Sequence, residues 1–84
     1  PNPIDLTQHA PELTVAGLPQ RATVRIFSPA GRLVEVLEVE NSRVGGTTWD
    51  LRTRRGEQVP SGIYLVRVEA PETSPVLKKM AVIR

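Results

Sequence analysis

The side chains that most often carry catalysis are scarce in this chain. His9 is the sole histidine, and it lies in a proline-containing segment with no catalytic partner beside it. The chain has no cysteine, which excludes a thiolate nucleophile, a cysteine metal ligand and a disulfide framework. A catalytic site needs a nucleophile or a metal together with a positioned base. We therefore expect His9 to be a solvated linker residue.

The carboxylates offer two candidate ligand sets, and each has a plainer interpretation. Asp50 can accept hydrogen bonds from the backbone amides of the turn that follows it. Glu35, Glu38 and Glu40 lack the ligand spacing of a calcium loop and are expected to solvate a strand face. Gly45-Gly46 is not followed by the Lys-Ser/Thr of a phosphate loop. We expect no catalytic, cofactor-binding or metal-binding residues, and a protein that is not an enzyme.

Arginines gather in one predicted loop, at Arg52, Arg54 and Arg55. Binding of single-stranded nucleic acid would need aromatic rings beside them on which bases can stack. Trp49 is predicted to be buried, so we expect no nucleic-acid partner. Sugar binding would also need exposed rings, and Phe27 is the ring left over for it. A carbohydrate-binding accessory domain therefore stays an alternative.

The last predicted strand carries Lys78 and Lys79 in its middle and Arg84 at its end. Lysines on an edge strand prevent unwanted pairing with other strands. The other interpretation is that this strand offers its main chain and its charges to a partner by adding to another sheet. Both interpretations place the strand at the edge of its sheet.

Composition limits the chain to one modest domain. It has 84 residues, 39% of them hydrophobic and 24% charged, which is typical of a folded globular domain. Its net charge of +2 gives little attraction to nucleic acid or anionic lipid. No apolar run approaches the roughly 20 residues of a membrane-spanning helix. Because the chain begins with Pro1 and not methionine, we expect a longer polypeptide whose upstream part could carry an export signal.

The stretch from Trp49 to Tyr64 organises the predicted fold. It joins a strand that ends in the sole tryptophan to a strand that holds the sole tyrosine. Each ring can bury on the order of 150–250 Å², so we expect the two rings to share one interior. Gly56 and Gly62 are expected to adopt backbone angles that other residues rarely take. The residues of this structural motif are Trp49, Asp50, Gly56, Gly62 and Tyr64.

Alternating apolar and polar residues predict an all-β fold. The predicted strands, with only brief pairing in the fifth, cover residues 12–18, 22–28, 32–40, 47–51, 57–60, 63–70 and 76–84. Turn residues separate them. Short strands at this spacing predict an immunoglobulin-like β-sandwich of about seven antiparallel strands.

The positions of prolines and apolar residues predict where the domain begins and where two of its strands lie in their sheets. Residues 1–11 contain three prolines and show no strand period, so we expect an extended lead-in or linker before a domain over residues 12–84. Prolines flank the strand at 12–18, which we therefore expect at an edge. Ile63 and Leu65 make both faces of the strand at 63–70 apolar, so we expect it at the centre of its sheet.

The segment from residue 28 to residue 40 is expected to form a turn and a strand. Ser28-Pro29-Ala30-Gly31 has the composition of a type I turn. The apolar residues after it are three apart, which fits neither strict alternation nor a full helical face. We expect a strand with a bulge, and a helix over residues 33–40 is the alternative.

The order of these features resembles a known family, the C-terminal sorting domain of the type IX secretion system, which is similar to the immunoglobulin-like domain of the flagellar hook-capping protein. The match covers nearly the whole chain. The motifs that carry it are Pro1-Asn2-Pro3, Leu18-Pro19, Val24-Arg25-Ile26-Phe27-Ser28, Gly31-Arg32-Leu33-Val34, Trp49-Asp50, Gly56, Pro60-Ser61-Gly62-Ile63-Tyr64 and Lys79-Met80.

Three positions depart from the family pattern. Ser28 stands where the family has aspartate, and either side chain can accept hydrogen bonds from the backbone amides that follow. Ile4 stands where phenylalanine or alanine is usual. Leu51 stands where glycine usually follows the Trp-Asp pair, so the backbone of this corner is expected to differ.

The resemblance implies a non-catalytic module that directs a larger exported protein through the type IX secretion system to the cell surface. The implied partners are the outer-membrane secretion machinery, a sortase-like peptidase and an upstream cargo domain in the same chain. The implied location is secreted or cell-surface, reached through the periplasm and outer membrane. A structural spacer or assembly module is the alternative. The residues assigned to translocon recognition are Lys78, Lys79, Met80, Ala81, Val82, Ile83 and Arg84.

Overall fold

A computed structural model describes residues 4–9, 12–40, 45–71 and 73–83 of the chain. The described residues form seven strands and no helix. The strands are β1 (Asp5–His9), β2 (Glu12–Ala16), β3 (Ala22–Phe27), β4 (Leu33–Val39), β5 (Gly46–Trp49), β6 (Gly62–Ala70) and β7 (Thr73–Val82).

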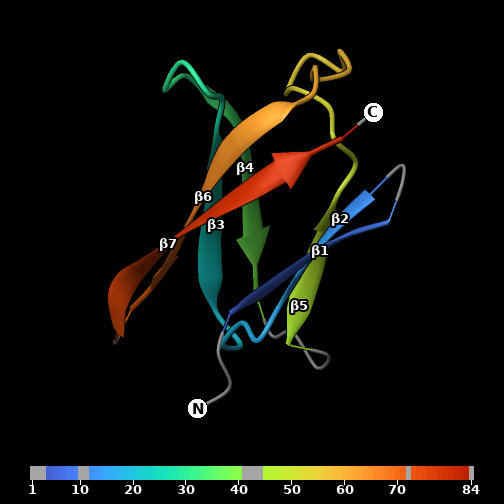
Figure 1. Cartoon of the computed structure of the whole chain (residues 1–84). Helices are drawn as coiled ribbons and strands as arrows, with labels where there is room; N and C mark the ends of the chain where they lie inside the picture. Colours follow the sequence, from blue (N-terminus) through green and yellow to red (C-terminus); the bar gives the residue numbers. More distant parts are fainter. Residues whose placement is uncertain (1–3, 10–11, 41–44, 72, 84) are drawn as a thin grey trace.

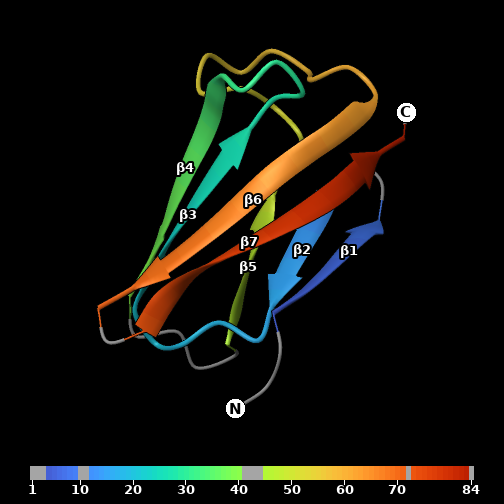
Figure 2. The same ribbon diagram turned by 60° about the vertical axis from the view of Figure 1, so that its left-hand side comes forward.

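The strands build two antiparallel sheets that face each other across one core. One sheet has three strands in the order β1-β2-β5, and the other has four in the order β4-β3-β6-β7. Figures 1 and 2 show the two layers from directions 60° apart. This arrangement confirms the prediction of an all-β, immunoglobulin-like sandwich of about seven strands.

The core consists of side chains that alternate along the strands. In β3 the buried residues are Ala22, Val24 and Ile26, and in β6 they are Tyr64, Val66 and Val68. The facing sheet contributes Leu13, Val15 and Trp49. Since successive side chains of a strand point to opposite faces, the alternation read from the sequence places one apolar face of each sheet inward.

The expectation of an extended lead-in is wrong for Asp5–His9, which form β1 and pair with β2 over five residue pairs. This segment has only Leu6 as an apolar residue, so its strand arises from pairing with β2 and not from its own pattern. The expected edge position of β2 is wrong for the same reason, because β1 covers the side of β2 that β5 leaves open. The expected pairing over residues 57–60 is limited to one bridge between Arg52 and Gln58.

The turn and the bulge expected between residues 28 and 40 are both present. The amide of Gly31 donates to the carbonyl of Ser28 at 2.8 Å, and the Ser28 Oγ accepts from the amide of Arg32 at 3.2 Å. Serine thus makes the backbone contact expected where the family has aspartate. The β3–β4 register shifts between Ile26 and Phe27, and β4 is a strand and not the alternative helix.

β6 lies between β3 and β7, which confirms its central position, and β7 lies at the edge of the four-stranded sheet. The reason given for the central position is only partly right, because Ile63 on the second face of β6 is 52% exposed. That face is the outer surface of the sandwich. Pairing on both sides, and not cover on both faces, makes β6 central.

Gln8 joins the first strand to the end of the last one. Its Nε2 donates to the carbonyl of Ile83 at 2.9 Å, and its Oε1 accepts from the amide of Ile83 at 3.1 Å. The two residues are 75 positions apart, and Ile83 directly follows β7, which belongs to the other sheet. The carboxamide therefore pairs with the backbone of Ile83 as a neighbouring strand would.

We expect Gln8→Ala to lower the free energy of unfolding by about 1–2 kcal/mol, because two net hydrogen bonds are lost. Urea denaturation measures this change, and amide hydrogen exchange at Ile83 should accelerate. Thr7→Ala, at an exposed neighbouring position of β1, is the control and should change neither quantity appreciably. Equal stability of the Gln8 and Thr7 variants would show that the pairing contributes nothing.

Candidate functional site

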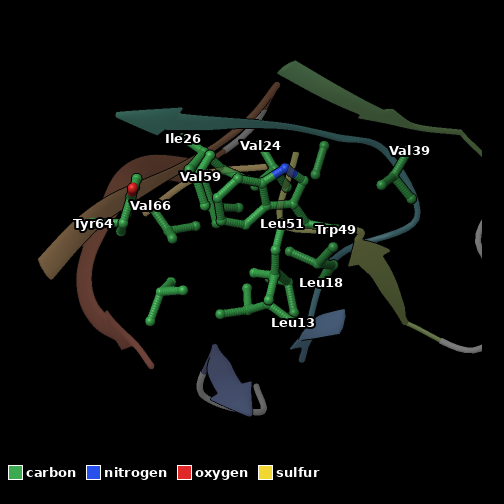
Figure 3. Close-up of a cluster of buried hydrophobic side chains, with 14 residues drawn as sticks. Leu13, Leu18, Val24, Ile26, Val39, Trp49, Leu51, Val59, Tyr64 and Val66 are labelled. Carbon is green, nitrogen blue, oxygen red and sulfur yellow. The ribbon is translucent and has the colours of Figure 1, made fainter. Parts of the chain in front are cut away.

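Trp49 lies at the centre of the core, at the end of β5 (Figure 3). It is 1% exposed, and its Nε1 donates to the carbonyl of Arg52 at 2.8 Å. The Asp50 Oδ1 accepts from the amide of Arg52 at 3.1 Å, which confirms that its carboxylate binds a turn amide. Both side chains bind the backbone of Arg52, and these two hydrogen bonds hold the corner that follows β5.

Tyr64 closes the same corner from the start of β6. Its ring lies 5.9 Å from that of Trp49, at an interplanar angle of 60°, and is 1% exposed. Its hydroxyl donates to the carbonyl of Pro60 at 2.7 Å, four residues upstream. This is the geometry of the tyrosine corner of immunoglobulin-like sandwiches. The prediction that the two rings share one interior is confirmed.

The two glycines of the motif act in different ways. Gly56 has φ of +86° and donates to the carbonyl of Thr53 at 2.9 Å, so it takes the left-handed conformation expected of it. Gly62 is not among the residues with positive φ, and that expectation is wrong. A Cβ at Gly62 would lie 2.9 Å from the Cγ of Pro29 in the β3–β4 turn. Gly62 is therefore needed for close packing of β6 against this turn.

Leu51 has φ of +61° and is 1% exposed, so it combines a strained backbone with a place in the core. Left-handed backbone is unfavourable for a residue with a Cβ. This explains why glycine suits the position in the family that the motifs resemble. In this chain the buried leucine side chain offsets the strain.

We expect Leu51→Ala to cost about 2–4 kcal/mol of unfolding free energy, because it empties a buried site. Leu51→Gly should be more stable than Leu51→Ala by about 0.5–1 kcal/mol, because glycine tolerates the positive φ. Urea denaturation of both variants gives the comparison. At an ordinary strand position the glycine variant would be less stable than the alanine variant. If Leu51→Gly proves less stable than Leu51→Ala, the positive φ of Leu51 does not strain the backbone.

β7 presents the open edge of the four-stranded sheet. Lys78 pairs with the buried Val66 and so belongs to the inner face, yet it is exposed. Lys79 pairs with Leu65 on the outer face and is exposed as well. Val82, further along the same inner face, is buried, so the core covers the end of β7 but not its middle at Lys78. Both faces of β7 are therefore open around the two lysines.

The residues assigned to translocon recognition differ in their exposure to solvent. Lys78, Lys79, Ala81 and Ile83 are exposed, Met80 is half-buried and Val82 belongs to the core. Arg84 lies outside the described residues. Two exposed apolar residues of β7, Val76 and Leu77, extend this surface toward the start of the strand, and Leu77 is 61% exposed. Both residues belong to the strand predicted over residues 76–84, but their place on this surface follows from their exposure and not from their residue type.

Two searches of the described residues bear on other kinds of site. Within residues 4–9, 12–40, 45–71 and 73–83, no group of three or more His, Cys, Asp or Glu residues could hold a metal ion. The same part of the chain contains no helix that is long and apolar enough to span a membrane.

No family profile and no curated protein matches the sequence. Two solved structures from Porphyromonas gingivalis do match the fold. One is PorZ, an essential bacterial surface component of the type-IX secretion system, with a TM-score of 0.71 and 34% identity over 86% of this chain. The other is dimeric latent PorU, with a TM-score of 0.68 and 26% identity over 95% of this chain.

The chain spans only 9% of the length of each of these two structures, so the resemblance is that of a single domain. The fold, the Trp49–Tyr64 corner and the β7 edge agree with the motif order read from the sequence. The chain therefore resembles, in sequence motifs and in fold, the C-terminal domain family of the type IX secretion system.

Proposed function

We propose that this chain is a non-catalytic sorting module that directs a larger exported protein through the type IX secretion system. The proposal is supported by the resemblance to PorZ, a surface component of that system. The observation that carries it is the open edge of β7, ten residues long, with lysines in its middle and apolar residues exposed beside them.

The recognition step in this proposal is strand addition. An edge strand offers unpaired N–H and C=O groups, and an incoming strand gains hydrogen bonds from them and specificity from the side chains on either face. Val76 and Leu77 supply apolar contacts on the two faces of β7, and Lys78 and Lys79 supply charge. Ile83 lies beyond this region and is already paired with Gln8.

The proposed partners are the outer-membrane secretion machinery and a sortase-like peptidase. The proposed cargo is an upstream domain of the same polypeptide, and the proposed location is secreted or at the cell surface. The core supports a passive role for the domain, because its largest aromatic side chains are buried and hold the sandwich together.

The experiment compares two fusions in a bacterium that has the type IX machinery. Residues 1–84 follow a reporter with an N-terminal signal peptide in one fusion, and they lie between the signal peptide and the reporter in the other. We expect the reporter at the cell surface only in the first case, because a sorting domain acts at the C-terminus. Equal retention of both fusions in the periplasm would refute the proposal.

A structural spacer is the second candidate, because the chain corresponds to a single domain of each much longer neighbour. A spacer would not deliver either fusion to the surface. Sugar binding loses two of its three possible platforms, because Trp49 and Tyr64 are each 1% exposed. Phe27 on the outer face is half-buried and remains the single ring available for it.

A further inference from the structure

A groove opens at the end of the sandwich where the β3–β4 turn meets the loop between β5 and β6. Both segments lie at the same end of the molecule in Figures 1 and 2. The groove has a volume of about 450 Å³, and it is lined by Arg32, Leu33, Val34, Thr53, Arg54, Arg55 and Glu57. It lies beside β4, which is the sheet edge opposite β7.

Hydrogen bonds hold the loop side of the groove in one shape. The amide of Arg54 donates to the carbonyl of Val34 at 3.1 Å, which fixes the loop to β4. The Thr53 Oγ1 accepts from the amides of Arg55 and Glu57 at 3.2 and 3.3 Å. The backbone that carries the arginines is therefore ordered before any partner arrives, which reduces the entropic cost of binding.

The cations of the groove are available to a partner. Among the described residues, no hydrogen bond or ion pair engages the guanidinium groups of Arg32, Arg54 and Arg55. Arg52 of the same loop differs, since its Nη1 donates to the carbonyl of Gly56 at 2.8 Å. Arg52 thus supports the loop, and the other three arginines face solvent around the groove.

The groove combines these charges with an apolar surface. Leu33, 44% exposed, and Val34 line it between the arginines. Three arginines and Glu57 leave the lining with a net charge of 3 − 1 = +2. Guanidinium groups bind carboxylates through paired hydrogen bonds, which a lysine cannot reproduce. The chemistry therefore fits a carboxylate that is accompanied by an aliphatic group.

Other classes of macromolecule fit the groove less well. A flat bilayer meets a convex tip better than a hollow, and it does not require arginine in place of lysine. Single-stranded nucleic acid binds on aromatic rings that its bases can stack against, and none of the residues that line the groove is aromatic. A polypeptide can insert one acidic side chain and lay a neighbouring aliphatic side chain on Leu33.

We propose that this arginine groove, formed by Arg32, Arg54 and Arg55 over Leu33 and Val34, binds an acidic segment of a partner protein. The surface is separate from the β7 edge, so the proposal does not depend on the sorting function. It assigns Arg32, Arg54 and Arg55 to carboxylate recognition. The sequence alone does not predict this site, because Arg32 is distant from Arg54 in the chain.

The test titrates the ¹⁵N-labelled 84-residue chain with a capped octapeptide in which two leucines separate three pairs of glutamates. We expect amide shifts to change at Arg32, Leu33 and Thr53–Arg55. The variant Arg32→Ser/Arg54→Ser/Arg55→Ser should bind the peptide at least about tenfold more weakly, because buried or partly desolvated charge pairs are lost. These side chains are exposed, so its melting temperature should stay the same.

Arg21→Ser is the control, because Arg21 is an exposed arginine at the other end of the sandwich, beside Glu38, Glu40 and Glu69. It should bind the peptide as the unchanged chain does. A glutamine version of the peptide should not bind. The proposal is overturned if Arg21→Ser weakens binding as much as the triple variant does, if the peptide does not bind, or if phosphatidylglycerol vesicles bind the chain more tightly than the peptide does.

Discussion

Replacing Trp49 by alanine is expected to lower the free energy of unfolding by about 3–5 kcal/mol. The indole is 1% exposed, packs 5.9 Å from the Tyr64 ring and donates to the carbonyl of Arg52. Most other fully buried side chains are valines and leucines. For a domain of this size, with a stability of about 4–12 kcal/mol, the loss would leave a large unfolded population.

Urea denaturation followed by far-ultraviolet circular dichroism measures this effect, because the variant lacks the sole tryptophan that fluorescence would use. Phe27→Ala is the control, since Phe27 is a half-buried ring on the outer face of the same sandwich. We expect it to cost about 1 kcal/mol, because a partly exposed ring contributes less burial. Equal midpoints for the Trp49 variant and the unchanged chain would contradict a core built around the indole.

Reversing the charge of the β7 edge is expected to reduce delivery of a reporter to the cell surface at least about tenfold, because charge complementarity governs encounter and rejects wrong partners. The change is Lys78→Glu/Lys79→Glu. Both lysines are exposed and make no ion pair within the part of the chain that the structure describes. Folding should therefore be unaffected, and the loss should lie in recognition.

Surface-exposed reporter is measured by protease accessibility in intact cells, alongside the melting temperature of the purified domain. Lys78→Gln/Lys79→Gln should give an intermediate loss, because it removes the positive charge without reversing it. Arg21→Glu at the other end of the sandwich should be delivered normally. If the reversed variant keeps its melting temperature and is delivered like the unchanged chain, the lysines of β7 are not recognised.

The local sequence pattern predicted the strands in which apolar and polar residues alternate. It also predicted the aromatic core, because the chain has few aromatic residues and needs the large ones to fill its interior. Ala22, Val24 and Ile26 alternate cleanly and are buried. Trp49 and Tyr64 are the two largest buried side chains, so their pairing followed from the small number of residues able to fill a core. The turn at Ser28 followed from the stereochemistry of proline and glycine.

Local pattern failed where a neighbour distant in sequence decides the conformation. β1 is a polar strand that exists because β2 pairs with it. Gln8 contacts Ile83, which is 75 positions away in the sequence. Gly62 packs on Pro29 of another turn, and no local signal shows that contact.

The arginine groove could be predicted only in part, because a contact between residues distant in sequence completes it. Arg54 and Arg55 form a cluster in the sequence, whereas Arg32 joins them only because Arg54 binds the carbonyl of Val34. The β7 edge was predicted more fully, since lysines in the middle of a strand are typical of a sheet edge. The contribution of Val76 and Leu77 required their exposure to be known.

The most direct test of the sorting function measures the fraction of a reporter at the cell surface when residues 1–84 form its C-terminus. The same fusion is expressed in a strain with the type IX machinery and in an isogenic strain that lacks it. We expect most of the reporter at the surface of the first strain and nearly all of it in the periplasm of the second. The same distribution in both strains would contradict the proposed function.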